Sequence, residues 1–296
     1  MTSAAAPSRT PNLGSVIAAL DELYPPRLAE SWDRIGLSVG RRQDPVAKIL
    51  FAVDPVEAVV DEALAWGADL IVTHHPFFFA PVHSVSSDSD RGELVHRLIQ
   101  GGCALFSAHT NADSAARGVN DALADLLGLT ETRPLVPAAD PADAASGLGL
   151  GRVGQLEVPA TLAEFAKVVA ERLPQVAQGI RVSGDLDSQV QTVAVLGGSG
   201  ESLAKAAAAA LADVYVTSDM KHHGALDLRA EFVHRARSEG KDPAGRPFLI
   251  DTAHYASESP WLPYAAGDLA ALLETQGFVV EVKVCAINTD PWTTRL

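Results

Sequence analysis

Short aliphatic runs alternate along the chain with segments of helical periodicity. Residues 48–53 ("KILFAV") and 69–75 ("DLIVTHH") are almost continuously apolar, which is typical of strands buried on both faces of a parallel sheet. Residues 55–66 lie between them and have helical spacing, with Pro55 at the start and Gly67 directly after the end. The same alternation continues beyond these elements and predicts an α/β fold.

The second half of the chain repeats the first at an offset of 144 residues. "KILFAVD" (48–54) aligns with "TVAVLGG" (192–198), and "ADLIVTHH" (68–75) aligns with "ADVYVTSD" (212–219) with no gap in the helix between them. The next strand, "LFSAH", then aligns with "LIDTA". Because internal repeats define architecture, the offset predicts two similar α/β domains that arose by internal duplication.

The predicted organisation has three parts. Residues 1–130 form the first α/β half, 131–190 a connecting segment without a large inserted domain, and 191–296 the second half. The stretch 134–150 is rich in Pro, Ala, Asp and Gly, so we expect a linker or an exposed loop there. An amphipathic helix with a capping box is expected over 161–173.

The overall charge and composition narrow the choice of partners and compartment. The chain has 47% hydrophobic residues, a formal charge of −14 and a pI near 5.0, which disfavours binding to nucleic acid or to anionic membranes. It has neither an apolar run long enough to span a bilayer nor the apolar core of a signal peptide. Cys103 and Cys285 lie in apolar runs without a CxxC motif. We therefore expect a cytoplasmic protein with two buried, reduced thiols.

Polar residues gather where the predicted strands end, and the carboxyl ends of parallel strands are where sites form. Those that carry metal-binding or acid–base groups, or an amide, are His74, His75, His109, Asn111, Asp113, Asp219, His222, His223, Asp251, His254 and Glu258. Imidazole and carboxylate groups together suit Zn, Fe, Mn or Co. The sequence therefore predicts a metal site, with the identity of the metal left open.

The spacing of these residues predicts how they could share two ions. At the transition from strand to loop, the side chains of His74 and His75 can diverge toward two separate ions. His254 and Glu258 are four residues apart and share a face if they begin a helix. Asp113 is the natural bridging carboxylate. Each has a plain alternative: a packed core histidine, a helix-surface pair, or, for Asp113, a cap on the following helix.

Two further features leave their roles open. His222 and His223 lie either in a solvated loop or at the start of a helix. "GGSGES" (197–202) resembles a phosphate-cradling turn before a helix, and together with Lys221 it could meet a phosphate. It lacks the full Walker or dinucleotide fingerprint, and the chain has no GxSxG motif.

Seven motifs follow one another in an order that resembles the GTP cyclohydrolase I type 2 homologue family, whose members are toroidal hexamers with a dinuclear metal centre. The motifs are "ESWDRIGLSVG" (30–40), "IVTHHPFFF" (71–79), "SAHTNAD" (107–113), "GLGRVG" (149–154), "VLGGSGES" (195–202), "VTSDMKHH" (216–223) and "DTAHYASE" (251–258). One departure is Arg34, which stands where the family commonly has Asn.

The resemblance implies two similar α/β domains with two divalent metal ions between them. By motif, His74 and His75 are ligands, Asp113 is the bridging carboxylate, and His254 and Glu258 complete the set. His109 of the "HTNAD" motif lies close by. The resemblance also implies a homohexamer built as a trimer of dimers.

Two functions are compatible with these residues. The first is a metal-dependent hydrolase acting on a purine nucleotide, with His109 as general acid or base. It follows the resemblance, since some members of the family are credited with opening the purine ring of GTP. The second is a non-catalytic role in metal handling, or as a ring-shaped interaction protein. Neither involves nucleic acid or a membrane.

Overall fold

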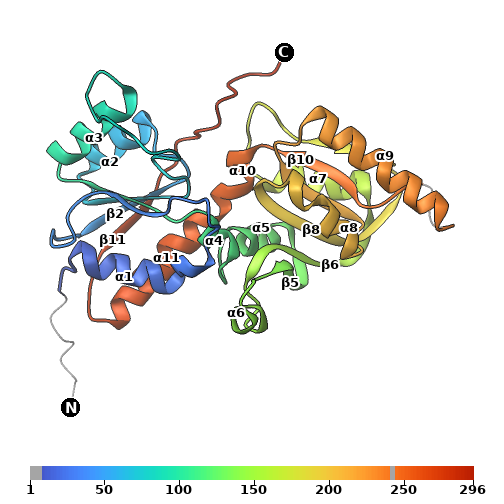
Figure 1. Ribbon diagram of the computed structural model, residues 1–296, viewed down its shortest axis with the longest axis horizontal. Coiled ribbons are helices and arrows are strands. Elements are labelled where there is room, and N and C mark those ends of the chain that lie inside the picture. The colour runs from blue at the N-terminus through green and yellow to red at the C-terminus, as the bar shows by residue number, and fades with distance from the viewer. Residues whose placement is uncertain (1–8, 241–243) are drawn as a thin grey trace. The chain divides into compact units, whose positions relative to one another are not determined.

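The computed structural model describes residues 9–240 and 244–296, and the chain forms two compact units (Figure 1). Unit 1 takes the chain up to Ala115 and then Leu262–Thr289, whereas unit 2 takes Ala116–Trp261 and Asp290–Leu296. The division therefore differs from the predicted boundaries at 130 and 190. Residues 262–289 return to unit 1 because they supply a strand and a helix that complete it.

Unit 1 is built on a five-stranded sheet with the order β1-β4-β3-β2-β11. All neighbours are parallel except the pair β1 and β4. The strands are β1 (Gly36–Val39), β2 (Lys48–Ala52), β3 (Leu70–Thr73), β4 (Ala104–Ser107) and β11 (Glu281–Val284). β2 and β3 follow the predicted apolar runs, but β3 ends before His74 and His75.

Helices cover both faces of this sheet (Figure 1). They are α1 (Leu13–Leu23), α2 (Glu57–Trp66), α3 (Asp90–Gln100), α4 (Thr110–Ser114) and α11 (Leu262–Thr275), with a 3-10 turn η1 (Pro26–Leu28). On one face, Leu50 of β2 shares a buried cluster with Val59 of α2 and Leu94 of α3. On the other, α1 packs against α11. The cap of α1 is Asn12, whose Oδ1 accepts the Ser15 N–H at 2.8 Å.

Unit 2 is built on a six-stranded sheet with the order β5-β6-β8-β9-β10-β7. The strands are β5 (Leu129–Pro137), β6 (Gly149–Thr161), β7 (Arg181–Ser183), β8 (Gln189–Ser199), β9 (Val214–Ser218) and β10 (Phe248–Thr252). The expectation of a linker over 134–150 is wrong. That stretch contains the end of β5, the helix α6 (Pro141–Ala145) and the start of β6. Pro141 begins α6, and Gly147 and Gly149 have positive φ values in the connection from α6 to β6.

The helices of unit 2 also lie on both faces of their sheet (Figure 1). They are α5 (Val119–Leu127), α7 (Leu162–Arg172), α8 (Ala204–Ala209), α9 (His222–Ser238) and α10 (His254–Glu258), with 3-10 turns η2 (Glu201–Leu203) and η3 (Ser259–Trp261). α5 and α7 share one buried cluster with the sheet, and α8 and α9 share the other. The capping box predicted for α7 is confirmed at Thr161 and Glu164.

The two sheets contain the same four-stranded arrangement. In unit 1, the parallel strands β2, β3 and β4 are flanked by the antiparallel β1, and in unit 2, β8, β9 and β10 are flanked by the antiparallel β7. The registers agree as well, because Leu70 pairs with Ala104 and Val214 pairs with Phe248, each 144 residues further along. This arrangement matches the repetition that the sequence offset predicts.

One hydrogen-bonding pattern is repeated at the same offset. Asp69 Oδ2 accepts the backbone N–H groups of Ala47 and Lys48 at 2.7 and 2.9 Å. Asp213 Oδ2 accepts those of Gln191 and Thr192 in β8, the positions 144 residues further along, both at 2.8 Å. Each carboxylate therefore binds two backbone N–H groups of the neighbouring segment at the equivalent place in its unit.

No helix within residues 9–240 and 244–296 is long and apolar enough to cross a membrane.

Candidate metal centre

His74 and His75 lie just beyond the carboxyl end of β3 in unit 1. Their backbone N–H groups donate to Ala52 O at 3.2 Å and Val53 O at 2.9 Å, so the ladder with the neighbouring strand continues through both residues. The two rings are 5.1 Å apart and tilted by 45°. The two imidazoles therefore lie next to each other at the end of the strand.

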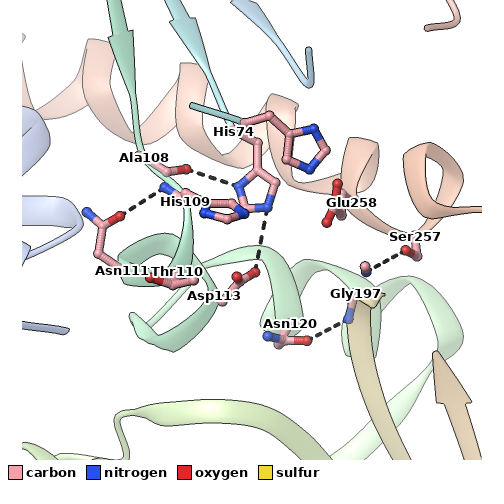
Figure 2. Close-up of polar contacts among 12 residues, drawn as sticks. His74, Ala108, His109, Thr110, Asn111, Asp113, Asn120, Gly197, Ser257 and Glu258 are labelled. Atoms are coloured by element: carbon pink, nitrogen blue, oxygen red, sulfur yellow. Dashed lines mark hydrogen bonds and ion pairs between the residues drawn. The ribbon is translucent and has the colours of Figure 1, made fainter. Parts of the chain in front are cut away.

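Each of these imidazoles has its Nδ1 atom held by an acceptor. His74 Nδ1 donates to the Ala108 carbonyl at 3.0 Å (Figure 2), and His75 Nδ1 donates to Asp54 Oδ1 at 2.6 Å. Because carbonyl and carboxylate oxygens only accept, the proton of each neutral ring is at Nδ1. The lone pair is then at Nε2, which is the usual arrangement of a metal-binding histidine with a supporting acceptor behind it.

His109 joins the same group from the end of β4. It is the residue before α4, and its Nδ1 donates to Asp33 Oδ1 at 2.9 Å. Asp33 Oδ2 also accepts the Thr110 N–H at 3.0 Å, so the carboxylate is fixed from two directions. One ligand atom from each of His74, His75 and His109 lies within 4.8 Å of the others. The structure thus places His109, the predicted acid–base group, among potential ligands.

Asp113 extends from α4 toward the His74 ring (Figure 2). Its Oδ1 is 3.8 Å from His74 Nε2. That separation is too long for a hydrogen bond, but two ligand atoms bonded to one ion at about 2.1 Å each lie roughly 3–4 Å apart. The alternative that Asp113 caps the following helix is wrong, because the cap of α5 is Gly118.

In unit 2, His254 and Glu258 form a second, smaller group. They begin and end α10, directly after β10, and the four-residue spacing brings His254 Nε2 to 2.9 Å from Glu258 Oε1. His254 Nδ1 donates to Asp219 Oδ2 at 2.6 Å. The predicted common face of a short helix is therefore confirmed, and Nδ1 is again held by a carboxylate.

The two carboxylates make this position strongly favourable for a cation. Burial is the largest single influence on the pKa of His254 and lowers it, but the charge of Glu258 and the hydrogen bonds to Asp219 and Glu258 together raise it to about 11. In the absence of metal, a proton is thus held at Nε2 between acidic groups. A divalent cation that replaced this proton would meet the same favourable field.

The glycines at the carboxyl end of β8 have a structural task in unit 2. The Gly197 N–H donates to Asn120 Oδ1 and the Gly198 N–H to Ser257 Oγ, both at 2.9 Å (Figure 2). A Cβ atom on Gly198 would lie 2.3 Å from Glu258 Oε1. These two N–H groups are therefore already engaged and do not cradle a phosphate. The glycines instead allow the strand end to approach the carboxylate closely.

The remaining polar residues at strand ends have other positions and other hydrogen-bond partners. His222 and His223 begin α9 and are exposed, which decides between the two alternatives for them. The Lys221 N–H donates to Glu201 Oε2 at 2.8 Å. Asp251 accepts the Met220 N–H at 2.8 Å and pairs with Arg181.

Sequence reasoning missed the acceptors behind the histidines. Asp54 lies two residues after the end of β2, so the strand-end rule that selected the histidines could have found it. Asp219 was noted at a strand end but was given no role. Asp33 lies 76 residues from its partner, and no local pattern connects the two. Arg34 supports the same turn, since its backbone N–H donates to Asp33 Oδ1 at 2.7 Å.

The residues that are present fit a transition metal. Unit 1 brings together three imidazoles and a carboxylate, and unit 2 an imidazole and a carboxylate, all at the carboxyl ends of strands. The fold and the site define a class: an α/β protein of two sheets whose strand ends carry a His/Glu/Asp cluster able to bind metal. The number and identity of the ions are not set by this geometry.

Comparison with known proteins agrees with that class. Residues 11–291 match the model of the Duf34/NIF3 (NGG1p interacting factor 3) family, and the chain belongs to this family. A Streptomyces coelicolor protein named "GTP cyclohydrolase 1 type 2 homolog" is 46% identical, with 97% of this chain and 95% of that protein aligned. A Mycobacterium leprae protein of the same name is 34% identical, over 95% and 94% of the two chains. The resemblance seen in the sequence motifs is thereby confirmed.

A solved structure shows the same fold. It is described as a Bacillus cereus protein related to NIF3 and has a TM-score of 0.83 at 28% identity, covering 96% of this chain and 99% of that one. The mixed α/β architecture with two sheets is therefore the architecture of this family.

Proposed function

We propose that the protein is a dinuclear metal-dependent hydrolase that acts on a purine nucleotide. The observation that carries the proposal is the state of four histidines, His74, His75, His109 and His254. Each has its Nδ1 held by a carboxylate or a carbonyl, at 2.6 to 3.0 Å. A set of surface or core histidines has no reason to share this arrangement, whereas metal-binding histidines do.

The proposed ligands are the five that the sequence motifs indicate. They are His74, His75 and Asp113 from unit 1, with His254 and Glu258 from unit 2. The support for this set is the donor chemistry within each unit taken separately. Asp113 has the bridging role because its second carboxylate oxygen allows it to serve two ions. Zn, Fe, Mn and Co all suit these donors.

The residues of the chain have separate tasks in this proposal. When bound, divalent ions supply Lewis-acid polarisation of a substrate and of water. His109 exchanges a proton with the substrate at Nε2, because Asp33 holds its Nδ1 proton and fixes the ring. The ligand atoms of His74, His75 and His109 lie within 4.8 Å of one another, so the proton exchange takes place close to the proposed ligands.

The nature of the substrate and the assembly also belong to the proposal. The name of the Streptomyces coelicolor relative supports a guanine nucleotide as the substrate class. We propose a cytoplasmic homohexamer built as a trimer of dimers, as the resemblance implies. The charge of −14 argues against nucleic acid and anionic membranes as partners.

The test combines elemental analysis with a nucleotide panel. Native protein, the His74→Ala variant and a His96→Ala control are compared for bound metal, for turnover of GTP and other nucleotides, and for mass in solution. His96 is an exposed residue of α3, so its loss should change nothing. His74→Ala should lose metal and turnover together. Because His74 is fully buried, His74→Gln and a circular dichroism spectrum separate loss of metal from loss of fold.

Two outcomes would change the conclusion. Turnover in His74→Ala equal to that of the native protein would show that the site is not the catalytic one. Bound metal without turnover of any nucleotide would instead favour the second function, in which the ring-shaped hexamer handles metal or binds other proteins.

A further inference from the structure

Two exposed aromatic side chains flank His109 in unit 1. Trp32 is 56% exposed and Phe79 is 58% exposed, although both are large and apolar. The Trp32 ring lies 5.9 Å from the His109 ring at 79°, and the Phe79 ring lies 5.8 Å from it at 83°. Both rings thus make edge-type contacts with one imidazole and leave more than half of their surface open to solvent.

The position of Trp32 is fixed by its neighbours and is not that of a loose loop. The side chain of the next residue, Asp33, is bonded to His109 and to the Thr110 N–H. The Glu30 N–H donates to Thr110 Oγ1 at 2.9 Å. The turn that carries Trp32 is therefore held on both sides of the residue, so the exposed ring is presented at low entropic cost.

The position of Phe79 is fixed by the two phenylalanines before it. Phe77 is buried and Phe78 packs against the core, with their rings 4.5 Å apart. The Arg91 guanidinium lies 4.8 Å above the Phe77 ring. These two side chains anchor the segment, and Phe79 alone extends toward His109.

We propose that Trp32 and Phe79 form an aromatic platform that binds the planar heteroaromatic ring of the substrate beside His109. The inference rests on the proposed function for the identity of that ring as a purine base. Aromatic faces stack on flat π-systems with little dependence on the identity of the base, whereas a phosphate group gains little from them. Two rings in contact with the same imidazole would hold the base within reach of His109 Nε2.

The experiment measures binding and not turnover. Guanosine, which has a base but no phosphate, and ribose 5-phosphate, which has a phosphate but no base, are titrated by equilibrium dialysis. The proteins are the native chain, Trp32→Leu, Phe79→Leu and a Trp292→Leu control. Leucine keeps an apolar side chain but removes the π-face. Trp292 is also exposed, at 66%, and has no contact with His109 among those described for the chain.

Trp32→Leu and Phe79→Leu should each bind guanosine about five- to tenfold more weakly. This is the lower end of the loss in affinity expected when one stacked aromatic ring is removed. Affinity for ribose 5-phosphate should stay the same, and Trp292→Leu should behave as the native chain. Quenching of tryptophan fluorescence by guanosine should persist in Trp292→Leu and be lost in Trp32→Leu.

Three results would overturn the platform. They are undetectable guanosine binding by the native chain, equal guanosine affinity in all four proteins, and an equal loss for ribose 5-phosphate. A change of mass in solution without a change in guanosine binding would assign the two rings to a contact between protein chains.

The outcome separates the platform from the proposed function. Weaker guanosine binding in the variants, with no turnover by the native chain, would retain the platform and remove the hydrolase. Turnover by the native chain, with unchanged guanosine binding in the variants, would retain the hydrolase and remove the platform.

Discussion

Replacement of Gly198 by alanine should disable the metal-binding group of unit 2 without unfolding the protein. Gly198 has φ = +71°, and an added Cβ would lie 2.3 Å from Glu258 Oε1 and 3.2 Å from His254 Nε2. Ordinary contact begins near 3.4 Å, so the carboxylate must move by about 1 Å. Glu258 is 2% exposed and has little space into which it can move.

The control for this change is Gly147→Ala, in the same unit. Gly147 has φ = +76°, but an added Cβ would meet nothing within 4 Å. Both variants should lose about 1–2 kcal/mol in the free energy of unfolding, because an L-residue is strained in the left-handed region. Only Gly198→Ala should also lose metal affinity, by about 10- to 100-fold, the range known for a disturbed ligand environment.

Urea denaturation of the metal-free proteins measures the strain, and titration with Zn²⁺ or Mn²⁺ measures the affinity. If Gly198→Ala bound metal as tightly as Gly147→Ala, the assignment of Glu258 as a ligand held by this close approach would be refuted. If the two variants differed widely in urea without metal, the clash would act on the fold rather than on the site.

Three further predictions concern the support of His75, the two strand-binding carboxylates and the buried thiol of Cys103. Asp54→Ala should weaken metal binding about tenfold or more in a direct titration, since it removes the acceptor that orients His75. Asp69→Ala should lower the free energy of unfolding in urea by about 2 kcal/mol, because it removes two charge-assisted hydrogen bonds. Asp213→Ala should lower it by at least as much, because it also removes the contact of Asp213 Oδ1 with Arg246 at 2.7 Å. Burial, aided by a nearby acidic charge, raises the pKa of the Cys103 thiol to about 12, so its contribution to stability is complete below about pH 8.5 and is lost as the pH rises toward 12. Urea denaturation across that range should show the decline, and an aromatic disulfide reagent at pH 8 should react with Cys103 only after unfolding.

Much of the fold could be predicted because it depends on local periodicity. The apolar runs at 48–53 and 69–75 must be buried on both faces, and they became β2 and β3. The expectation for 134–150 failed because proline and glycine also occur at strand ends and at the start of a short helix, and the pairing of β5 with β6 joins residues that no local window compares.

The site could be predicted in part for a similar reason. Imidazoles and carboxylates at strand ends can be recognised in the sequence, and the short helix that brings His254 beside Glu258 follows from a four-residue spacing. Capping and metal binding, by contrast, use the same residue types. The role of Asp113 could therefore be separated from that of a helix cap only when the true cap, Gly118, was seen.

The sequence by itself determined the α/β class, the 144-residue repetition and the set of imidazoles and carboxylates that are candidates for metal binding, because each of these depends on residue type and on spacing along the chain. Only the tertiary structure decided which acceptors and aromatic rings lie next to these candidate ligands. Asp33 is hydrogen-bonded to His109, which lies 76 residues further along the chain, and Trp32, the residue before Asp33, contacts the same imidazole. The return of β11 to β2 was likewise decided there. Such contacts come from packing between distant segments, and this packing has no period that can be read along one strand or helix.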